Sequence, residues 1–307
     1  MNRYLANKKA VALFVAPALI LFIVFVFVPI IQVFYYSFFE WDGVNQATFL
    51  GIDNYTKLFK STVFSVANLN GLKFGLLITI YQIFFATIFA LAVSDKRVPF
   101  RKFFRTAYFI PVVLSVTIVC QLWVSIFDAD HGLLNTLMKR LGSSWQQNWL
   151  NGRYSAIWAV AFVNAWQWMG YQFALIVAGM KSISTDYYEA AELDGCTAVQ
   201  THWYMTLPLL KDTYNFCLLV SVTGGIKAFT EIQIMTRGGP GQATNTLAYI
   251  MYKQAFITHK YGYGLSAASI LVLECLVVIL VLNFLFRDRD EALLRREARR
   301  AGKGAKA

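Results

Sequence analysis

Residues 11–35 read VALFVAPALILFIVFVFVPIIQVFY, an apolar run of 25 residues that contains no charged side chain. A helix needs about 20 mostly apolar residues to cross the hydrocarbon core of a bilayer. The run is too long for the apolar region of a signal peptide, and no small-residue cleavage site precedes Gln32. It therefore predicts a membrane-spanning helix.

Five further apolar stretches reach a similar length. They cover residues 74–93, 107–127, 156–180, 214–235 and 265–286. Apolar residues make up 57% of the chain and charged residues only 15%, against about 25% charged residues in an ordinary globular protein. The composition excludes a soluble, disordered, collagen-like or disulfide-rich protein. We expect an all-α membrane protein with six transmembrane helices.

Three prolines lie inside these stretches or at their ends. They are Pro17, Pro29 and Pro111. A proline removes one helical hydrogen bond, and in a membrane the freed carbonyl must find another partner. We expect neighbouring helices to provide it.

The distribution of lysine and arginine predicts the orientation of the helices. Eighteen of the 28 lie in one set of segments and nine in the alternating set. The first set comprises residues 1–10, 94–106, 181–213 and 287–307, and the second comprises residues 36–73, 128–155 and 236–264. Because cytoplasmic segments are rich in positive charge, both termini should face the cytoplasm. The net charge of +11 then reflects topology and attraction to anionic lipid, and no nucleic-acid partner is expected.

Cysteine and histidine do not form a recognisable site. Cys120, Cys217 and Cys275 fall in expected spans and Cys196 falls in a cytoplasmic loop, so no disulfide is expected. The histidines occupy separate loops without the spacing of metal ligands; they are His131, His202 and His259. We expect no metal site.

The loop between the fourth and fifth spans differs from an ordinary connector. Residues 182–208 read SISTDYYEAAELDGCTAVQTHWYMTLP. Asp186 can cap a helix with Glu189 three residues on, and Gly195 can end it in the left-handed conformation. A second helix should begin after Thr197 and stop before the proline at 208. The pattern predicts a helix–turn–helix.

Three interpretations of this helix–turn–helix differ in function. It could lie on the membrane surface, with Trp203 and Tyr204 among the lipid headgroups, or it could dock onto a cytoplasmic partner. Reading of DNA is not expected, because the second helix carries no lysine or arginine to contact phosphate. Patterning alone leaves the first two open.

The sequence of the loop resembles a known family. EAAELDGCTAVQTHWYMTLPLL is similar to the EAA-type loop of the membrane subunits of binding-protein-dependent ABC importers. The matching residues are Glu189, Ala190, Ala191, Asp194, Gly195, Leu207 and Pro208. The sequence departs from the family pattern at Cys196, where alanine is usual, and at His202, where phenylalanine is common.

Other blocks along the chain resemble the same family. APALILF at the first span and FRTAYFIPVVLS at residues 104–115 look like family segments. GGPGQATNTLAYIMYKQAF, which begins at Gly238, looks like the carbohydrate-uptake branch, the maltose-permease-like subunits. The order and spacing of the blocks identify the chain as similar to these permeases.

The resemblance implies a type I ABC importer permease fold in a bacterial or archaeal inner membrane. Its layout would be a cytoplasmic N-terminus at 1–10, a six-helix permease domain at 11–286 that includes a coupling loop at 182–208, and a basic cytoplasmic tail at 287–307. Coupling to an ATPase subunit would fall to Glu189, Ala190, Ala191, Asp194 and Gly195. The implied partners are a second homologous permease, two ATP-binding subunits and an extracytoplasmic solute-binding protein.

The chain lacks the usual motif for binding ATP. No G-x-x-x-x-G-K-[S/T] segment occurs, and the glycine-rich GGPGQATNT at 238–246 has no lysine. We therefore expect a transport subunit without its own ATPase site and without a cofactor. ATP and Mg²⁺ would be used by the partner subunits.

Polar residues within the spans suggest a substrate pathway. Lys227 and Glu231 lie four residues apart in the fifth span and should share a helix face, where they could contact substrate or neutralise each other; Glu274 lies in the sixth. Trp166 belongs to a group of aromatic and amide residues in the fourth span that suits a sugar, although plain helix packing explains such residues equally well. That group comprises Asn164, Trp166, Gln167, Trp168, Tyr171 and Gln172 around Gly170. Alignment with maltose-permease-like proteins adds Met169, Gly170, Phe173, Ser221, Gly224, Gly225 and Ala228.

The sequence thus predicts the permease subunit of an ATP-driven importer, which forms half of the pathway for a sugar or oligosaccharide. The alternative is an ion-coupled secondary transporter that uses Lys227, Glu231 or Glu274. A membrane-embedded enzyme is disfavoured, because the histidines and cysteines are scattered. Neither of these rivals explains the loop at 182–208.

Overall fold

The computed structural model describes residues 8–95 and 98–286 of the 307. The expected cytoplasmic tail at 287–307, and residues 1–7 of the expected N-terminal segment, lie outside the described residues. The chain divides into two compact units. The first comprises Met1–Asn68 and Leu247–Leu273, and the second comprises Leu69–Thr246 and Glu274–Ala307.

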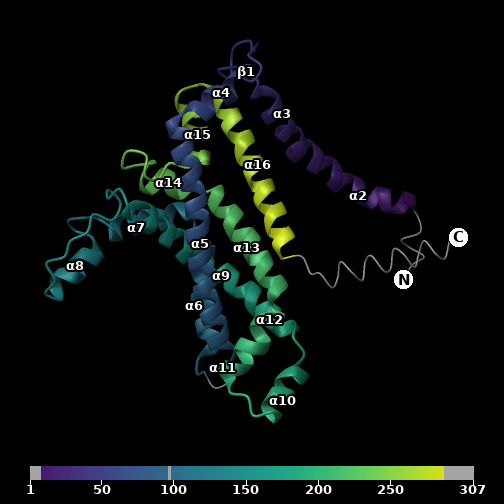
Figure 1. Ribbon diagram of the computed structural model, residues 1–307, viewed down its shortest axis with the longest axis vertical. Coiled ribbons are helices and arrows are strands. Elements are labelled where there is room, and N and C mark those ends of the chain that lie inside the picture. Colours follow the sequence, from purple (N-terminus) through teal and green to yellow (C-terminus); the bar gives the residue numbers. More distant parts are fainter. Residues whose placement is uncertain (1–7, 96–97, 287–307) are drawn as a thin grey trace. The chain divides into compact units, whose positions relative to one another are not determined.

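The first unit is built from helices and one short hairpin (Figure 1). Its elements are α2 (Lys8–Phe22), the π-helical turn η1 (Ile23–Phe27), α3 (Val28–Tyr36), β1 (Phe39–Glu40), β2 (Thr48–Phe49), α4 (Asp53–Lys60), α15 (Leu247–Tyr252) and the π-helical turn η3 (Lys253–Ile257). The starts of two long helices, α5 (Thr62–Ser94) and α16 (Tyr261–Leu285), complete it.

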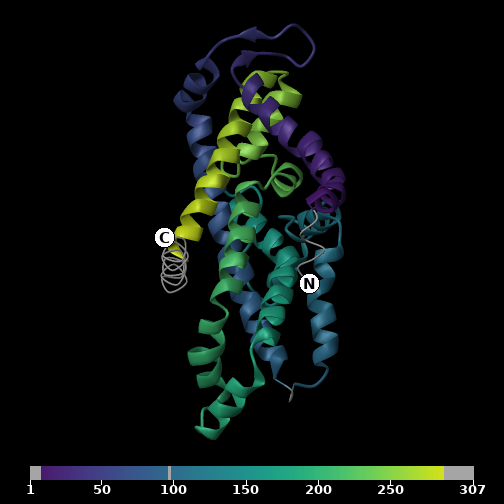
Figure 2. The ribbon, with the colours of Figure 1, turned by 90° about the vertical axis from the view of Figure 1, so that its right-hand side faces the viewer.

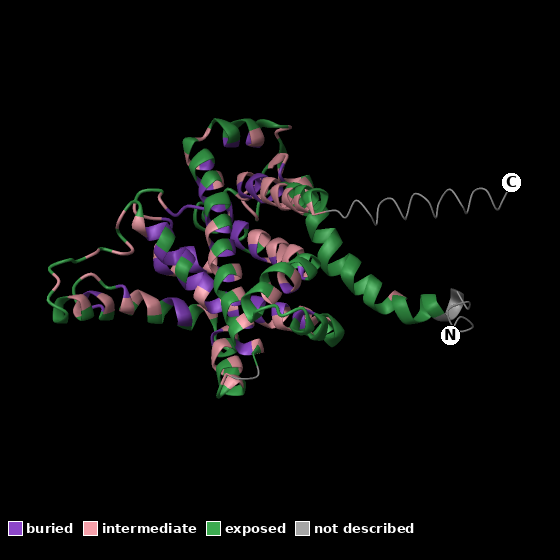
Figure 3. Cartoon of the chain, turned by 60° about the horizontal axis from the view of Figure 1, so that its bottom comes forward, coloured by how far each residue is buried: buried purple, intermediate pink, exposed green. Residues whose placement is uncertain are grey.

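The first apolar run forms a helix that is long and apolar enough to cross a membrane, as the sequence predicts. The helix spans Val11–Tyr36, and none of its most apolar window is buried, so it is exposed along its length (Figure 3). Pro29 does not break it, because the wider turn η1 precedes the proline. A helix this apolar and this exposed requires lipid or another protein chain around it.

The hairpin of the first unit is tied to the chain around it by a buried amide. β1 pairs with β2 in antiparallel fashion, with Phe39 opposite Phe49. Asn54 of α4 donates from Nδ2 to the carbonyls of Ser37 at 2.9 Å and Phe39 at 2.8 Å. A small apolar core lies beneath; it comprises Leu58, Phe64, Leu247 and Ala267.

The second unit contains the remaining helices. They are α6 (Arg101–Val113), α7 (Val116–Ile126), α8 (Leu133–Arg140), α9 (Ser155–Ser182), α10 (Thr185–Leu193), α11 (Ala198–Thr201), the π-helical turn η2 (His202–Thr206), α12 (Leu207–Leu209), α13 (Lys211–Ile226) and α14 (Thr230–Met235), with the ends of α5 and α16. Helices dominate both units, as the sequence predicts.

Within the described ranges, three helices meet the length and apolarity of a membrane span. They are Val11–Tyr36, Thr62–Ser94 and Tyr261–Leu285. α6 and α7 would add a fourth if taken together, but they meet at a bend of 99°. Residues 107–127 therefore do not form one continuous helix, and the prediction of a single span there is corrected to a bent pair of helices. Leu114 and Ser115 adopt extended conformations after Pro111, and the side chain of Gln167 donates to the freed Leu114 carbonyl at 2.9 Å.

The fourth expected span lies within α9, whose composition differs from that of the three apolar helices. α9 has 28 residues, and half of them are buried, including Asn164, Gln167 and Gln172. A helix shielded from lipid by its neighbours can carry amides as long as they are hydrogen-bonded. Because its neighbours shield α9, this helix can be long enough to span a bilayer without being uniformly apolar.

The fifth expected span is interrupted, which corrects the prediction for residues 214–235. α13 ends at Ile226 and α14 begins at Thr230. Lys227 and Glu231 therefore do not share one helix face. The side chain of Thr246 donates to the carbonyl of Ala228 in the break at 2.9 Å, so the freed backbone is satisfied as a non-polar environment requires.

Close backbone approach holds α13 against α5. A Cβ atom on Gly225 would collide with the backbone of Gly75 and come within 2.8 Å of Cδ1 of Ile78. One turn away, Thr79 of α5 donates to the hydroxyl of Ser221 at 3.0 Å. By contrast, a Cβ on the neighbouring Gly224 would meet nothing within 4 Å.

The adjacent glycines provide a matched test of this packing. We predict that Gly225→Ala destabilises the protein by about 1–3 kcal/mol, because α13 and α5 must separate. Gly224→Ala should change stability by less than about 0.5 kcal/mol. Thermal unfolding of both variants in detergent measures the difference, and equal effects would contradict the assigned contact.

Candidate functional site

A polar cavity of about 340 Å³ lies within the second unit. It is formed by α5, α9, α13, α14 and the break between the last two. The lining residues are Ile78, Gln82, Asn164, Trp168, Tyr171, Gln172, Val220, Ser221, Gly224, Lys227, Ala228, Phe229, Thr230 and Glu231. Its size lies at the lower end of the range for small-molecule sites.

Half of the residues that the sequence proposed for a substrate pathway line this cavity. They are Ser221, Gly224, Lys227, Ala228 and Glu231. Ser221 and Gly224 reach the cavity from the last turns of α13, whereas Lys227, Ala228 and Glu231 reach it from the break after Ile226 and from α14. Their role in transport stays a prediction.

The other proposed pathway residues lie elsewhere in the second unit. Trp166 packs edge to face on Trp123 of α7, with ring centroids 5.5 Å apart. Gly170 approaches α6, where a Cβ would lie 2.5 Å from the Tyr108 carbonyl oxygen. Phe173 belongs to a buried apolar cluster, Gly225 contacts α5, and Met169 is half-buried outside the cavity lining.

Gln82 was missed by reasoning from the sequence, although it carries a signal. It is the amide in the apolar stretch 74–93, and it is 3% exposed. An isolated buried amide needs partners, and those of Gln82 lie on α9. Nothing in the sequence identifies them, because they are far away along the chain.

Four buried side chains around the cavity form a chain of hydrogen bonds. Gln172 donates to Gln82 at 3.2 Å, Gln82 donates to Asn164 at 3.1 Å, and Asn164 donates to Oε1 of Glu231 at 2.6 Å. The chain links α9, α5 and α14. It gives Oε1 of Glu231 a donor, whereas the sequence left open whether Glu231 contacts substrate or is neutralised by Lys227.

Lys227 is exposed and lines the cavity. The break places Lys227 after α13 and Glu231 within α14, where Glu231 accepts from the amide of Asn164.

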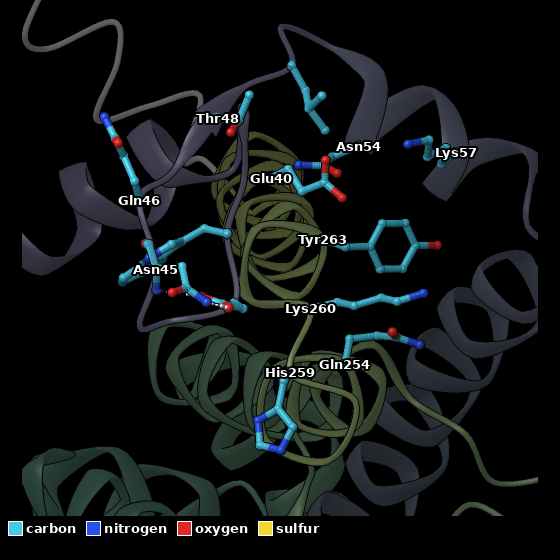
Figure 4. Close-up of a pocket in the computed structure, with 13 residues that line it drawn as sticks. Glu40, Asn45, Gln46, Thr48, Asn54, Lys57, Gln254, His259, Lys260 and Tyr263 are labelled. Atoms are coloured by element: carbon cyan, nitrogen blue, oxygen red, sulfur yellow. Dashed lines mark hydrogen bonds between the residues drawn. The ribbon is translucent and has the colours of Figure 1, made fainter.

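A second cavity, of about 610 Å³, lies within the first unit. Glu40, Asn45 and Thr48 border it from the hairpin, and Gln254, Lys260 and Tyr263 border it from the segment around the start of α16 (Figure 4). Asp42 accepts hydrogen bonds from the backbone N–H groups of Val44 and Asn45, and these bonds lower the pKa of its carboxyl to about 2. Asp42 therefore carries its negative charge throughout the physiological pH range.

The expected helix–turn–helix is present at one end of the second unit (Figure 2). Gly195 separates α10 from α11 with φ of +76°, as the left-handed prediction requires. The capping box of Thr197 and Gln200 is also confirmed. Glu189, Ala190 and Asp194 are exposed, whereas Ala191 is buried.

Two details of the loop differ from the prediction. Ser184 caps α10 by accepting from the Asp186 N–H at 3.3 Å, and Asp186 instead lies in the first turn. The second helix does not stop before Pro208. The turn η2 widens the helix ahead of that proline, so that α12 continues to Leu209.

His202 is partly enclosed in this loop. Burial lowers the pKa of its imidazole, although the carboxylate of Asp95 opposes the effect. Its Nδ1 lies 3.2 Å from the Thr206 hydroxyl. The position where the family commonly has phenylalanine is thus occupied by an inward-facing group, while Trp203 and Tyr204 beside it are exposed.

Fold and site together define a helical membrane protein with a cavity bordered by buried amides and with an exposed helical loop. The family model of the binding-protein-dependent transport system inner membrane component matches residues 82–290. The chain belongs to this family. It is therefore a membrane-embedded transport component that works with a solute-binding protein.

Similar proteins support the assignment over nearly the whole length. The chain is 34% identical to the probable ABC transporter permease protein YurN of Bacillus subtilis over 288 residues, which covers 93% of this chain and 98% of the relative. It is 31% identical to the arabinooligosaccharides transport system permease protein AraP of the same organism over 280 residues, which covers 91% and 88% respectively.

A solved structure shares the fold. It is the crystal structure of a bacterial alginate ABC transporter in complex with an alginate pentasaccharide-bound periplasmic protein. One of its chains matches with a TM-score of 0.78 and 21% identity, over 94% of this chain and 98% of that chain. The chain therefore has the fold of an ABC importer permease.

The capping box offers a local test of the loop. Thr197→Ala should remove the cap of α11, with a loss of about 1 kcal/mol that speeds amide exchange at residues 198–202 about fivefold. Thr197→Ser keeps the hydroxyl and should exchange like the wild type. Hydrogen exchange read by mass spectrometry measures both, and unchanged exchange in the alanine variant would show that the cap does not hold the helix.

Proposed function

We propose that the chain forms half of the translocation pathway for a sugar or oligosaccharide delivered by an extracytoplasmic solute-binding protein. The observation that carries the proposal is the cavity of the second unit. The aromatic residues Trp168 and Tyr171 line it together with the amides of Gln82, Asn164 and Gln172, and this combination suits sugars, which have apolar faces and hydroxyls. The names of relatives such as the arabinooligosaccharide permease support the same substrate class.

The proposed topology has six crossings in a bacterial or archaeal inner membrane, with both termini in the cytoplasm. Three crossings are uniformly apolar helices. The other three are α6 with α7, α9, and α13 with α14; their breaks and amides lie against protein rather than lipid. The positive charge of the alternating segments supports this orientation.

The exposed loop of the second unit is the proposed contact to an ATP-binding subunit. Glu189, Ala190 and Asp194 present a small, charged surface, and Gly195 fixes the direction of the chain beyond it. Two such subunits would bind ATP and Mg²⁺, and a second homologous permease would complete the pathway. The loop contains no nucleotide motif of its own.

The mechanism follows from linkage between these two sites. ATP binding would draw the loops of the two permeases together, and this movement would shift the cavity from inward-facing to outward-facing. The binding protein would release the sugar toward the outward-facing cavity, and hydrolysis would reset the pair. Such coupling requires an element with two discrete arrangements, for which the interrupted α13–α14 segment is suited.

The coupling role predicts a separation of hydrolysis from uptake. Glu189→Lys reverses a charge on the docking surface, and Gly195→Pro forbids the observed φ of +76°. Each variant should insert normally and lower sugar uptake at least tenfold, while ATP hydrolysis by the assembled complex continues. Parallel uptake and ATPase assays in membrane vesicles measure the ratio.

A charge reversal outside the loop serves as the control. Lys139 is exposed on α8, and Lys139→Glu should leave the ratio of uptake to hydrolysis unchanged. Normal uptake by both loop variants would refute the coupling role.

A further inference from the structure

The chain of buried amides has a direction, and one residue determines it. A carboxylate can only accept hydrogen bonds, whereas an amide can donate from nitrogen or accept at oxygen. Because Glu231 must accept, Asn164 has to turn its nitrogen toward Glu231 and its oxygen toward Gln82. Gln82 is then forced to donate to Asn164 and to accept from Gln172.

The orientation of these amides has a consequence for Gln172, at the opposite end of the row of hydrogen bonds from Glu231. Nε2 of Gln172 donates to Oε1 of Gln82 at 3.2 Å and to the carbonyl of Cys217 at 3.4 Å. Its Oε1 is buried and has no hydrogen-bond partner among the described residues. Gln172 is 1% exposed and lines the cavity. A buried acceptor without a donor is unfavourable, so this oxygen has the capacity to accept a further hydrogen bond.

We propose that Glu231 is a positioning residue that sets the hydrogen-bond polarity of the cavity. Through Asn164 and Gln82 it orients Gln172 so that a carbonyl oxygen, not an amide nitrogen, remains for a solute. The group that satisfies this oxygen is a hydroxyl of a neutral sugar, acting as donor. This second part rests on the proposed function, whereas the orientation of the chain does not.

The direction of the chain can be tested by moving the carboxylate to the opposite end. In Gln172→Glu, the new carboxylate faces the oxygen of Gln82, so that two acceptors oppose each other. In the double variant Gln172→Glu with Glu231→Gln, each amide between the two ends can turn over, so that donors again meet acceptors along the hydrogen-bond chain. Only the contact of the new carboxylate with the Cys217 carbonyl stays unfavourable, which is why the expected recovery is partial. The double variant keeps the net charge of the cavity, including the ammonium of Lys227.

Thermal unfolding of the purified protein in detergent measures the Tm of each variant and needs no ligand. Gln172→Glu should lower Tm by about 5 °C or more, and Glu231→Gln alone by less than about 2 °C. The double variant should recover at least half of the loss caused by Gln172→Glu. Additive losses, or a double variant that accumulates no better than Gln172→Glu, would overturn the proposal.

A second buried glutamine of α9 provides the matched control. Gln167 also donates from Nε2 to a carbonyl, that of Leu114, and also has an unpartnered buried Oε1, but it lies outside the amide chain. Gln167→Glu should destabilise the protein, and adding Glu231→Gln should not rescue it. Equal rescue at both positions would show that the coupling is a general charge effect and would contradict a directed chain.

The solute part is tested in the complete transporter with arabinotriose, maltotriose and diacetylchitobiose as probes. For a probe that stimulates the wild-type ATPase, Gln172→Met, which removes the acceptor oxygen, should require about tenfold more sugar for half-maximal stimulation. The double variant keeps an acceptor oxygen at position 172 and should require about as much sugar as the wild type. An unchanged requirement in Gln172→Met would refute the hydroxyl contact. If no probe stimulates the wild-type complex, the proposed sugar function loses its support, while the thermal result on the chain direction is unaffected.

Discussion

Backbone polar groups inside a hydrocarbon layer must find partners within the protein, and this constraint shapes the breaks in the helices. Between α6 and α7, the side chain of Gln167 donates a hydrogen bond to the carbonyl of Leu114. Between α13 and α14, the side chain of Thr246 donates a hydrogen bond to the carbonyl of Ala228. At Pro29 and Pro208 the helix continues, because a π-helical turn ends two residues before each proline.

The same constraint explains how a polar cavity can exist in so apolar a chain. The break after Ile226 places Lys227 and Glu231 beside α9 and α5, and the buried amides there satisfy one another in sequence. The cavity is polar because its polar groups are shared among helices, whereas the outer face of Val11–Tyr36 is apolar and exposed. Transport requires this contrast, since a solute with hydroxyl groups must cross a layer that excludes it.

Much of the fold could be predicted from the sequence, but the functional geometry could not. Uniformly apolar runs identify the first, second and sixth helices, and Gly195 with Thr197 and Gln200 identifies the turn of the exposed loop. The bend between α6 and α7 escaped prediction, because a bent helix pair looks as apolar as a continuous helix and its hydrogen-bonding partner, Gln167, lies more than 15 residues away. Lys227 and Glu231 were placed on one face for the same reason. Asp186 and Ser184 are both able to cap a helix, so the residue types alone do not decide between them. The prediction chose Asp186, whereas the backbone conformation makes Ser184 the cap.

The central claim is that this chain provides a pathway but not the energy to use it. The most direct measurement is uptake of a radiolabelled oligosaccharide into proteoliposomes, with the chain alone and with its second permease, ATP-binding subunits and solute-binding protein. The account predicts uptake only when all partners and ATP are present. Concentrative uptake by the chain alone, driven by an ion gradient without ATP, would contradict it.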